Sequence, residues 1–93
     1  MKYTKVPGAF NKHKVIVYSL TTCRHCIDAK NYLKEKNIAF KYINSDEASR
    51  DEKRKISQFL RKHDLPLAFP VIVIDDSVLL GFDEKEIEAL LNA

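Results

Sequence analysis

One stretch of the sequence is expected to decide the fold, and it reads Val15-Ile16-Val17-Tyr18-Ser19-Leu20-Thr21-Thr22-Cys23-Arg24-His25-Cys26. Its first four residues form a continuous β-branched and aromatic run, which is typical of a strand buried on both faces of a sheet. A helical pattern of apolar residues begins near Arg24. The two cysteines therefore lie at the point where a strand passes into a helix.

Cysteines at the start of a helix are suited to thiol chemistry. The first backbone N–H groups of a helix lack intrahelical partners, and the aligned peptide dipoles leave partial positive charge there, so a thiolate is stabilised. Cys23 falls at or next to the helix cap, and Cys26 follows on the same face, close enough to close a small disulfide. We therefore predict that the sulfur of Cys23 attacks and that the sulfur of Cys26 resolves.

The residues between the cysteines are cationic or able to become so. Arg24 is permanently charged, and His25 becomes charged if a neighbouring thiolate favours its protonated form. Both are expected to help stabilise a thiolate at Cys23. If both side chains point into water instead, solvent and salt screen this effect.

The composition indicates one small globular domain. A chain of 93 residues can fold around a single core, and its 45% hydrophobic content is unlike that of a disordered chain. The 2 cysteines enclose too little chain for a disulfide to restrict much conformational entropy. A purely structural disulfide therefore does not explain the pair.

Charge and hydropathy argue against several classes of function. The net charge of +3 comes from basic residues spread along the chain rather than gathered into a stripe, so nucleic-acid binding has no specific support. The apolar run from Val15 to Leu20 is too short for the core of a signal peptide, and nothing approaches the roughly 18 to 20 apolar residues that span a bilayer. We expect a cytoplasmic protein that does not insert into a membrane.

The apolar periodicity predicts the element order βαβαββα. The expected elements are a strand at 15–18, a helix at 24–36, a strand at 38–43, a helix from Ser49 to about His63, strands at 71–74 and 78–80, and a helix after Asp83. Residues 1–13 show no clear period, so we predict a lead-in, able to add an edge strand, before a domain at 14–93.

Local signals mark several boundaries between these elements. Asn37 is suited to the left-handed cap that ends a helix, and Ser49 with Glu52 fits a capping box. The charged run at 47–55 is best explained as a solvated helix face. The strand–helix–strand unit that begins at residue 15 predicts a right-handed crossover between parallel strands.

This order of elements, with Cys-x-x-Cys at the first strand-to-helix junction, resembles the thioredoxin fold, and its detail resembles the glutaredoxin family. The resemblance covers about residues 14–92. Its strongest part is the pattern Cys23-x-x-Cys26-x-x-Ala29-Lys30-x-x-Leu33, preceded by Tyr18-Ser19-Leu20-Thr21. Pro70, before the apolar run 71–74, matches the family's cis-proline, and Gly81-Phe82-Asp83 matches its glycine and helix cap beyond the hairpin.

The resemblance implies a fold and an activity. It implies an α/β thioredoxin-like fold with a four-stranded mixed sheet and helices on both faces. It also implies a monomeric thiol–disulfide oxidoreductase that reduces protein disulfides or glutathione mixed disulfides through a Cys23/Cys26 dithiol. No bound cofactor is expected, and glutathione is expected as a co-substrate.

The candidate site extends beyond the two cysteines. A cis bond before Pro70 would turn the preceding backbone so that the N–H and C=O of Phe69 pair with an extended substrate. The plain alternative is that Pro70 only starts an ordinary strand. The predicted substrate-binding residues are Thr22, Arg24, His25, Phe69, Pro70, Gly81, Phe82 and Asp83.

The departures from the family pattern bear on the electron source. Arg24-His25 replaces the common Pro-Tyr, Leu20 stands where many members carry a lysine for glutathione, and Leu80 replaces the first glycine of a Gly-Gly turn. The Leu-Gly-Phe-Asp sequence at 80–83 is closer to redoxins that supply ribonucleotide reductase and are recharged by thioredoxin reductase. Glutathione and thioredoxin reductase both remain possible electron sources.

Other classes of function compete with this interpretation. Cys-x-x-Cys with His25 offers soft ligands to Zn²⁺ or Cu(I), but a structural zinc site needs four ligands, and His13 and His63 are single histidines without paired spacing. We therefore predict no metal ligands. A dimer that shares an iron–sulfur cluster through Cys23 and two glutathiones is a second alternative, known in the family. A binding domain of this fold with incidental cysteines is a third.

Overall fold

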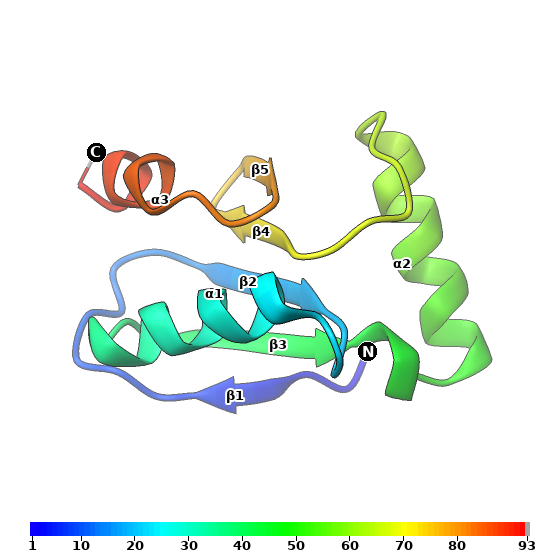
Figure 1. The fold of residues 1–93 in the computed structure, drawn as a ribbon, viewed down its shortest axis with the longest axis horizontal. Coiled ribbons are helices and arrows are strands. Elements are labelled where there is room, and N and C mark those ends of the chain that lie inside the picture. Colours follow the sequence, from blue (N-terminus) through cyan, green and yellow to red (C-terminus); the bar gives the residue numbers. More distant parts are fainter. Residues whose placement is uncertain (93) are drawn as a thin grey trace.

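The computed structural model describes residues 1–92 as a mixed sheet with helices on both faces (Figure 1). The elements follow in the order β1 (Thr4–Val6), β2 (Val15–Ser19), α1 (Arg24–Glu35), β3 (Phe40–Asn44), the 3₁₀ turn η1 (Ser45–Glu47), α2 (Arg50–Lys62), β4 (Val71–Ile74), β5 (Ser77–Leu80) and α3 (Glu84–Leu91). The predicted α/β class and the predicted order from β2 onwards are confirmed. No helix among residues 1–92 has the length and apolar character needed to cross a membrane.

The sheet has five strands in the order β1-β3-β2-β4-β5, which corrects the predicted four. β2 and β3 are parallel, and the other neighbouring pairs are antiparallel. The additional strand is β1, in which Lys5 pairs with Lys41 and Val6 with Phe40. Its three residues are mostly exposed and show no alternation of buried and exposed side chains. The strand is held mainly by its backbone pairing with β3, so no apolar pattern in the sequence indicates it.

The two central strands carry the core. Every residue of β2 and β4 is buried, as expected for strands covered on both faces. On one face α1 and α3 contribute Leu33 and Ile87, and on the other α2 contributes Ile56 and Leu60. Figure 1 shows α1 lying along β2 and β3, with its N-terminus at the carboxyl end of β2. This arrangement places the start of α1 at the carboxyl end of the central strand β2.

The predicted boundary signals are confirmed. Asn37 has a φ of 57°, which is the left-handed conformation expected after a helix. Ser49 and Glu52 form both hydrogen bonds of a capping box at the start of α2. Asp83 caps α3 by accepting hydrogen bonds from the backbone N–H groups of Lys85 and Glu86. These caps fix the residues at which α2 and α3 begin.

The segment before β2 is attached to the rest of the chain. Phe10 donates its backbone N–H to Asn37 at 3.0 Å and accepts from Ala39 at 2.9 Å. The Gly8 position approaches the backbone of residues 37–39 so closely that a Cβ there would meet main-chain atoms at 2.6 Å. His13 bonds both to Asp75 and to the carbonyl of Leu91. Residues 8–13 therefore pack against the end of the sheet opposite the cysteines.

Candidate active site

Cys23 is the N-cap residue of α1, as the sequence predicts. Its backbone is extended, with φ −89° and ψ 116°, and its Sγ accepts a hydrogen bond from the N–H of Cys26 at 3.2 Å. The residue is partly exposed, and both cysteines are free thiols. The Sγ atom thus lies at the positive end of the helix dipole, where solvent and a substrate can reach it.

Cys26 has a different environment, because its side chain is fully buried. Burial raises the pKa of the Cys26 thiol, and its hydrogen bond with Cys23 raises it further. The backbone N–H of Leu20 and the charge of Lys30 act in the opposite direction on this pKa. Cys26 is therefore held as a protonated thiol directly behind the exposed sulfur.

The peptide bond between Phe69 and Pro70 is cis, which confirms that prediction and rejects the alternative of a plain strand start. The carbonyl oxygen of Phe69 lies 3.8 Å from the Sγ of Cys23, which donates its S–H to it. The Pro70 carbonyl accepts a hydrogen bond from Gly81 N–H at 2.8 Å. The loop before β4 and the turn after β5 thus meet beside α1.

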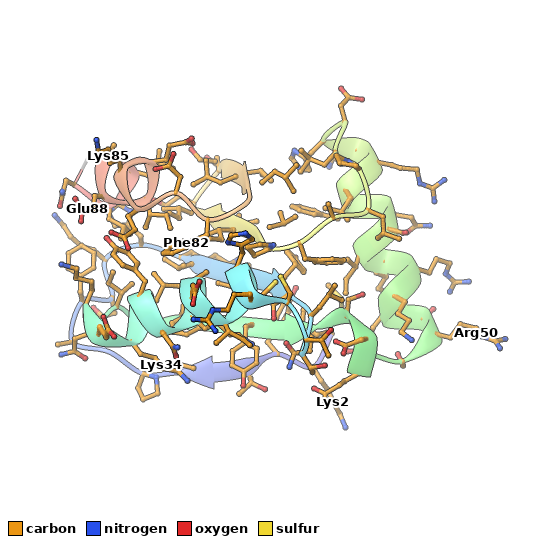
Figure 2. The ribbon with its side chains drawn as sticks, viewed as in Figure 1. Lys2, Lys34, Arg50, Phe82, Lys85 and Glu88 are labelled. Atoms are coloured by element: carbon orange, nitrogen blue, oxygen red, sulfur yellow. The ribbon has the colours of Figure 1, made fainter. Side chains whose placement is uncertain are left out.

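The turn after β5 brings the Gly81-Phe82-Asp83 segment to the same end of the molecule. Gly81 has a φ of 88°, a conformation that residues with a side chain rarely adopt. The Phe82 ring lies 5.6 Å from the ring of Tyr32 on α1, and Figure 2 shows it between α1 and the turn. Asp83 uses its carboxylate to cap α3, so this group is already engaged within the chain.

The predicted cationic contribution to the site is weak. Arg24 and His25 are both exposed, and the Arg24 side chain is 85% accessible while its Nε lies 3.3 Å from the Asp28 carboxylate. Exposed charges of this kind interact weakly in water. Thr22 is also exposed. The contact that the start of α1 makes with the Cys23 Sγ is the backbone N–H of Cys26 at 3.2 Å.

Two groups of residues at this end were not predicted. The Asp46 carboxylate accepts hydrogen bonds from the backbone N–H and the hydroxyl of Thr21, and these bonds lower the pKa of Asp46. Asn44 accepts from Ser19 and from Lys30. Their position in the sequence could have indicated them. Ser19 and Asn44 end two neighbouring parallel strands, and functional groups commonly lie at the carboxyl ends of such strands.

A third unpredicted feature is a set of exposed apolar side chains on the segments that meet at the site, which we call the apolar rim. It consists of Ile27 on α1, Leu67 in the loop before the cis-proline, and Leu80 at the end of β5, which are 40%, 71% and 46% exposed. Each of these residues belongs to a segment that bonds to or adjoins Cys23 or Pro70. Exposed apolar patches are typical of surfaces that contact another protein.

A metal-binding arrangement is not seen in the described part of the chain. Within residues 1–92 the cysteines are not joined by a third His, Cys, Asp or Glu in a group able to hold a metal ion. His13 bonds to Asp75 and Leu91 at the other end of the sheet. His63 packs against the ring of Phe59 on α2 at 4.6 Å between ring centroids.

The site and the fold match known proteins. The glutaredoxin family model matches residues 15–79. A glutaredoxin-like 8.6 kDa protein in the rubredoxin operon of Clostridium pasteurianum is 38% identical over 82% of this chain and 95% of its own length. A glutaredoxin-like protein NrdH from Lactococcus lactis is 37% identical over 82% of this chain and 97% of that protein.

The structural comparison agrees with the sequence comparison. The crystal structure of a glutaredoxin from Methanosarcina mazei superposes with a TM-score of 0.84 and 29% identity, over all of this chain and 90% of that one. The architecture is thus the thioredoxin-like fold, and the matching family is one of thiol–disulfide oxidoreductases. Sequence, fold and the position of Cys23 on α1 together show that this chain belongs to the glutaredoxin family.

Proposed function

We propose that this protein reduces protein disulfides and glutathione mixed disulfides, with Cys23 as the attacking sulfur and Cys26 as the resolving sulfur. The observation that carries the proposal is the contrast between the two thiols. Cys23 is partly exposed at a helix N-terminus, and Cys26 is buried directly behind it. The exposed sulfur can attack the substrate, and the buried sulfur can react only with the mixed disulfide that forms at Cys23.

The proposed reaction has two exchange steps. In the first, the Cys23 thiolate attacks a disulfide R–S–S–R′, forms a bond to one sulfur and releases the other as a thiolate, which takes a proton from water. In the second, Cys26 loses its proton and attacks the Sγ of Cys23, and the remaining substrate thiol departs. The product is a Cys23–Cys26 disulfide that an external two-electron donor must reduce.

The backbone at the cis-proline supports a binding mode for the substrate. The Phe69 carbonyl lies beside the Cys23 Sγ, and the Gly81 N–H fixes the Pro70 carbonyl. An extended substrate segment pairs with the backbone of Phe69, and this pairing places its sulfur over Cys23. We expect Thr22, Arg24, His25 and Phe82 to contribute further side-chain contacts to the substrate. Asp83 holds the adjoining turn by capping α3.

The apolar rim favours proteins over small thiols as partners. Ile27, Leu67 and Leu80 offer exposed apolar surface, whereas Leu20 occupies the position at which many family members carry a glutathione-binding lysine. A folded reductase or protein substrate buries such surface on binding, and a tripeptide buries little of it. We therefore expect thioredoxin reductase to serve as electron donor more efficiently than glutathione.

The test of this function compares electron donors on one substrate. A glutathionylated protein is supplied with either glutathione and glutathione reductase or thioredoxin reductase, and Cys23→Ser serves as the blank. We expect turnover with thioredoxin reductase and slower turnover with glutathione. Efficient turnover with glutathione alone would contradict the preference for a protein donor, and failure with both donors would overturn the proposed function.

The two cysteines are expected to behave differently on substitution. Cys23→Ser removes the attacking sulfur, so reduction should fall to the uncatalysed rate. Cys26→Ser retains attack but not resolution, so a mixed disulfide with the substrate should accumulate and be visible by intact-protein mass spectrometry. Equal loss of activity in both variants, without a trapped species in Cys26→Ser, would show that these roles are wrongly assigned.

A further inference from the structure

The burial of Cys26 creates a chemical difficulty for the second step. The resolving sulfur must become a thiolate before it can attack, yet its side chain is fully buried and burial raises its pKa. A nearby positive charge or hydrogen-bond donor would favour the ionised form. The structure supplies a donor in the Leu20 N–H and a charge in Lys30.

Lys30 is placed to act on Cys26 by the geometry of α1. It follows Cys26 by four residues, so the two side chains share one face of the helix. Helical side chains lean toward the N-terminus, so Lys30 covers the turn that contains Cys26. Its ammonium lies 4.5 Å from the centre of the Tyr42 ring, and the residue is only partly exposed.

Asn44 holds the Lys30 ammonium in this position. Its side-chain oxygen lies 3.4 Å from the Lys30 Nζ and accepts a second hydrogen bond from the Ser19 hydroxyl at 2.6 Å. Ser19 is fully buried at the end of β2 and is paired in register with Asn44. The contact that fixes Lys30 thus belongs to the sheet rather than to a mobile loop.

The charge of Lys30 is also not neutralised by a direct ion pair. Among the salt bridges of residues 1–92, none includes Lys30. Glu47 bonds to the amide nitrogen of Asn44 at 3.0 Å, and Asp46 bonds to Thr21. The carboxylates of η1 thus bond to Asn44 and Thr21, and the contact to Lys30 itself comes from the neutral amide oxygen of Asn44.

We propose that Lys30, held by Asn44 and Ser19, is a positioning residue that promotes resolution of the mixed disulfide by favouring the Cys26 thiolate. This proposal rests on the proposed function. In the step concerned, Cys26 gives its proton to water and its sulfur lone pair forms the bond to Cys23. The bond between Cys23 and the substrate sulfur breaks, its electron pair leaves with that sulfur, and the departing thiolate takes a proton from water.

The test separates the two exchange steps in Lys30→Met, which keeps an unbranched apolar chain against Tyr42. A single-turnover reaction with a glutathionylated peptide gives a concentration-dependent attack phase and a concentration-independent resolution phase. We expect resolution at neutral pH to slow about threefold, because the loss of one favourable charge lowers the fraction of Cys26 that is ionised. The pH profile of resolution should move to higher pH, and the attack rate should change less than twofold.

Three variants keep the result interpretable. Lys30→Arg retains the charge and should resolve at close to the wild-type rate. Lys34→Met removes the same charge one turn further along α1, where Lys34 is exposed (Figure 2), and should leave both phases unchanged. Lys30→Gln repeats the test if the methionine variant does not fold. A slower attack phase with unchanged resolution would assign Lys30 to substrate binding instead and overturn the proposal.

A second readout does not depend on activity. In a Cys23→Ser background, iodoacetamide alkylates the buried Cys26 slowly, and the ratio of the rates of two variants with equal burial at one pH gives the ratio of their Cys26 thiolate fractions. Adding Lys30→Met should slow alkylation about threefold at each pH between 7 and about 9, whereas adding Lys34→Met should not change it. Equal alkylation rates with and without Lys30 would overturn the proposal, whereas a wild-type protein that forms no mixed disulfide would refute the proposed function instead.

Discussion

At the scale of single residues, the two cysteines differ because one lies outside the core and the other inside it. Cys23 ends the β2–α1 connection at the helix cap, and Cys26 points into the core from the first turn of α1. The sequence predicted the position of Cys23 at the helix cap, because the cap follows from the strand-to-helix junction. It did not predict the environment of Arg24 and His25, since their exposure depends on how the neighbouring loops pack.

The buried thiol makes the stability of the reduced protein dependent on alkaline pH. The pKa of Cys26 is raised in the folded state, so the unfolded state loses its proton first and the stabilising contribution is present only below the unfolded pKa. The free energy of unfolding should fall above about pH 8.5, by up to about 1.4 kcal/mol per pH unit. Urea unfolding in the presence of a reductant, from pH 7 to about 9.5, measures this decline.

Two variants show whether Cys26 causes the decline. Cys26→Ala removes the titrating group and should flatten the pH dependence below the range where the tyrosines begin to ionise. Cys23→Ala should retain it, because burial is the largest cause of the raised pKa at Cys26. A profile of Cys26→Ala parallel to that of the wild type would assign the decline to other groups.

At the scale of elements, α2 and α3 begin at the residues that the sequence predicts, because a helix cap depends only on a few consecutive residues. The Ser49–Glu52 box needs only four consecutive residues, and both of its hydrogen bonds are present. Glu52 also accepts from the backbone N–H of Lys2 at 2.8 Å, and these bonds lower the Glu52 pKa to about 2. Figure 2 shows Lys2 at the N-terminal end of the chain near the start of α2, a contact that no local pattern indicates.

The capping box predicts a measurable loss on substitution. Ser49→Ala removes the side-chain acceptor of the Glu52 N–H and should lower the free energy of unfolding by about 1 kcal/mol. Ser57→Ala is the matched control, because it makes the same change in the interior of α2, where alanine is the better helix former. Chemical denaturation of both variants checks this. Equal effects would show that the cap contributes nothing beyond helix propensity.

At the scale of the whole molecule, His13 joins three segments that are far apart in the sequence. One ring nitrogen lies 2.6 Å from the Asp75 carboxylate in the β4–β5 turn, and the other lies 2.9 Å from the Leu91 carbonyl at the end of α3. Both partners are hydrogen-bond acceptors that face the ring nitrogens. Asp75 also accepts from the Lys14 N–H at 2.9 Å. This cluster closes the end of the sheet opposite the cysteines.

The cluster should make stability depend on acid pH. The hydrogen bonds from His13 and Lys14 lower the pKa of Asp75. A lowered folded-state pKa gives a contribution that is present above the unfolded pKa, about 3.9, and is lost as the pH falls through the folded pKa. Asp75→Asn should reduce stability at neutral pH and weaken its acid dependence, as measured by thermal unfolding between pH 7 and about 3.

The adjacent Asp76 provides the control, since it lies in the same turn without these hydrogen bonds among residues 1–92. Asp76→Asn should retain the acid dependence of the wild type. The acid profile of Asp75→Asn should differ from both. If all three profiles have the same slope, other carboxylates such as Glu52 account for the acid dependence.

The sequence by itself determined the order of elements, their caps and the cysteine pair, because each of these follows from contacts between residues a few positions apart. The tertiary structure alone decided the fifth strand, the apolar rim, and the placement of Lys30 by Asn44 and Ser19. These features join segments separated by many residues, and their pairing depends on backbone register and on which strand ends meet at one edge of the sheet. The spacing of apolar residues along the chain therefore does not predict which distant segments lie together.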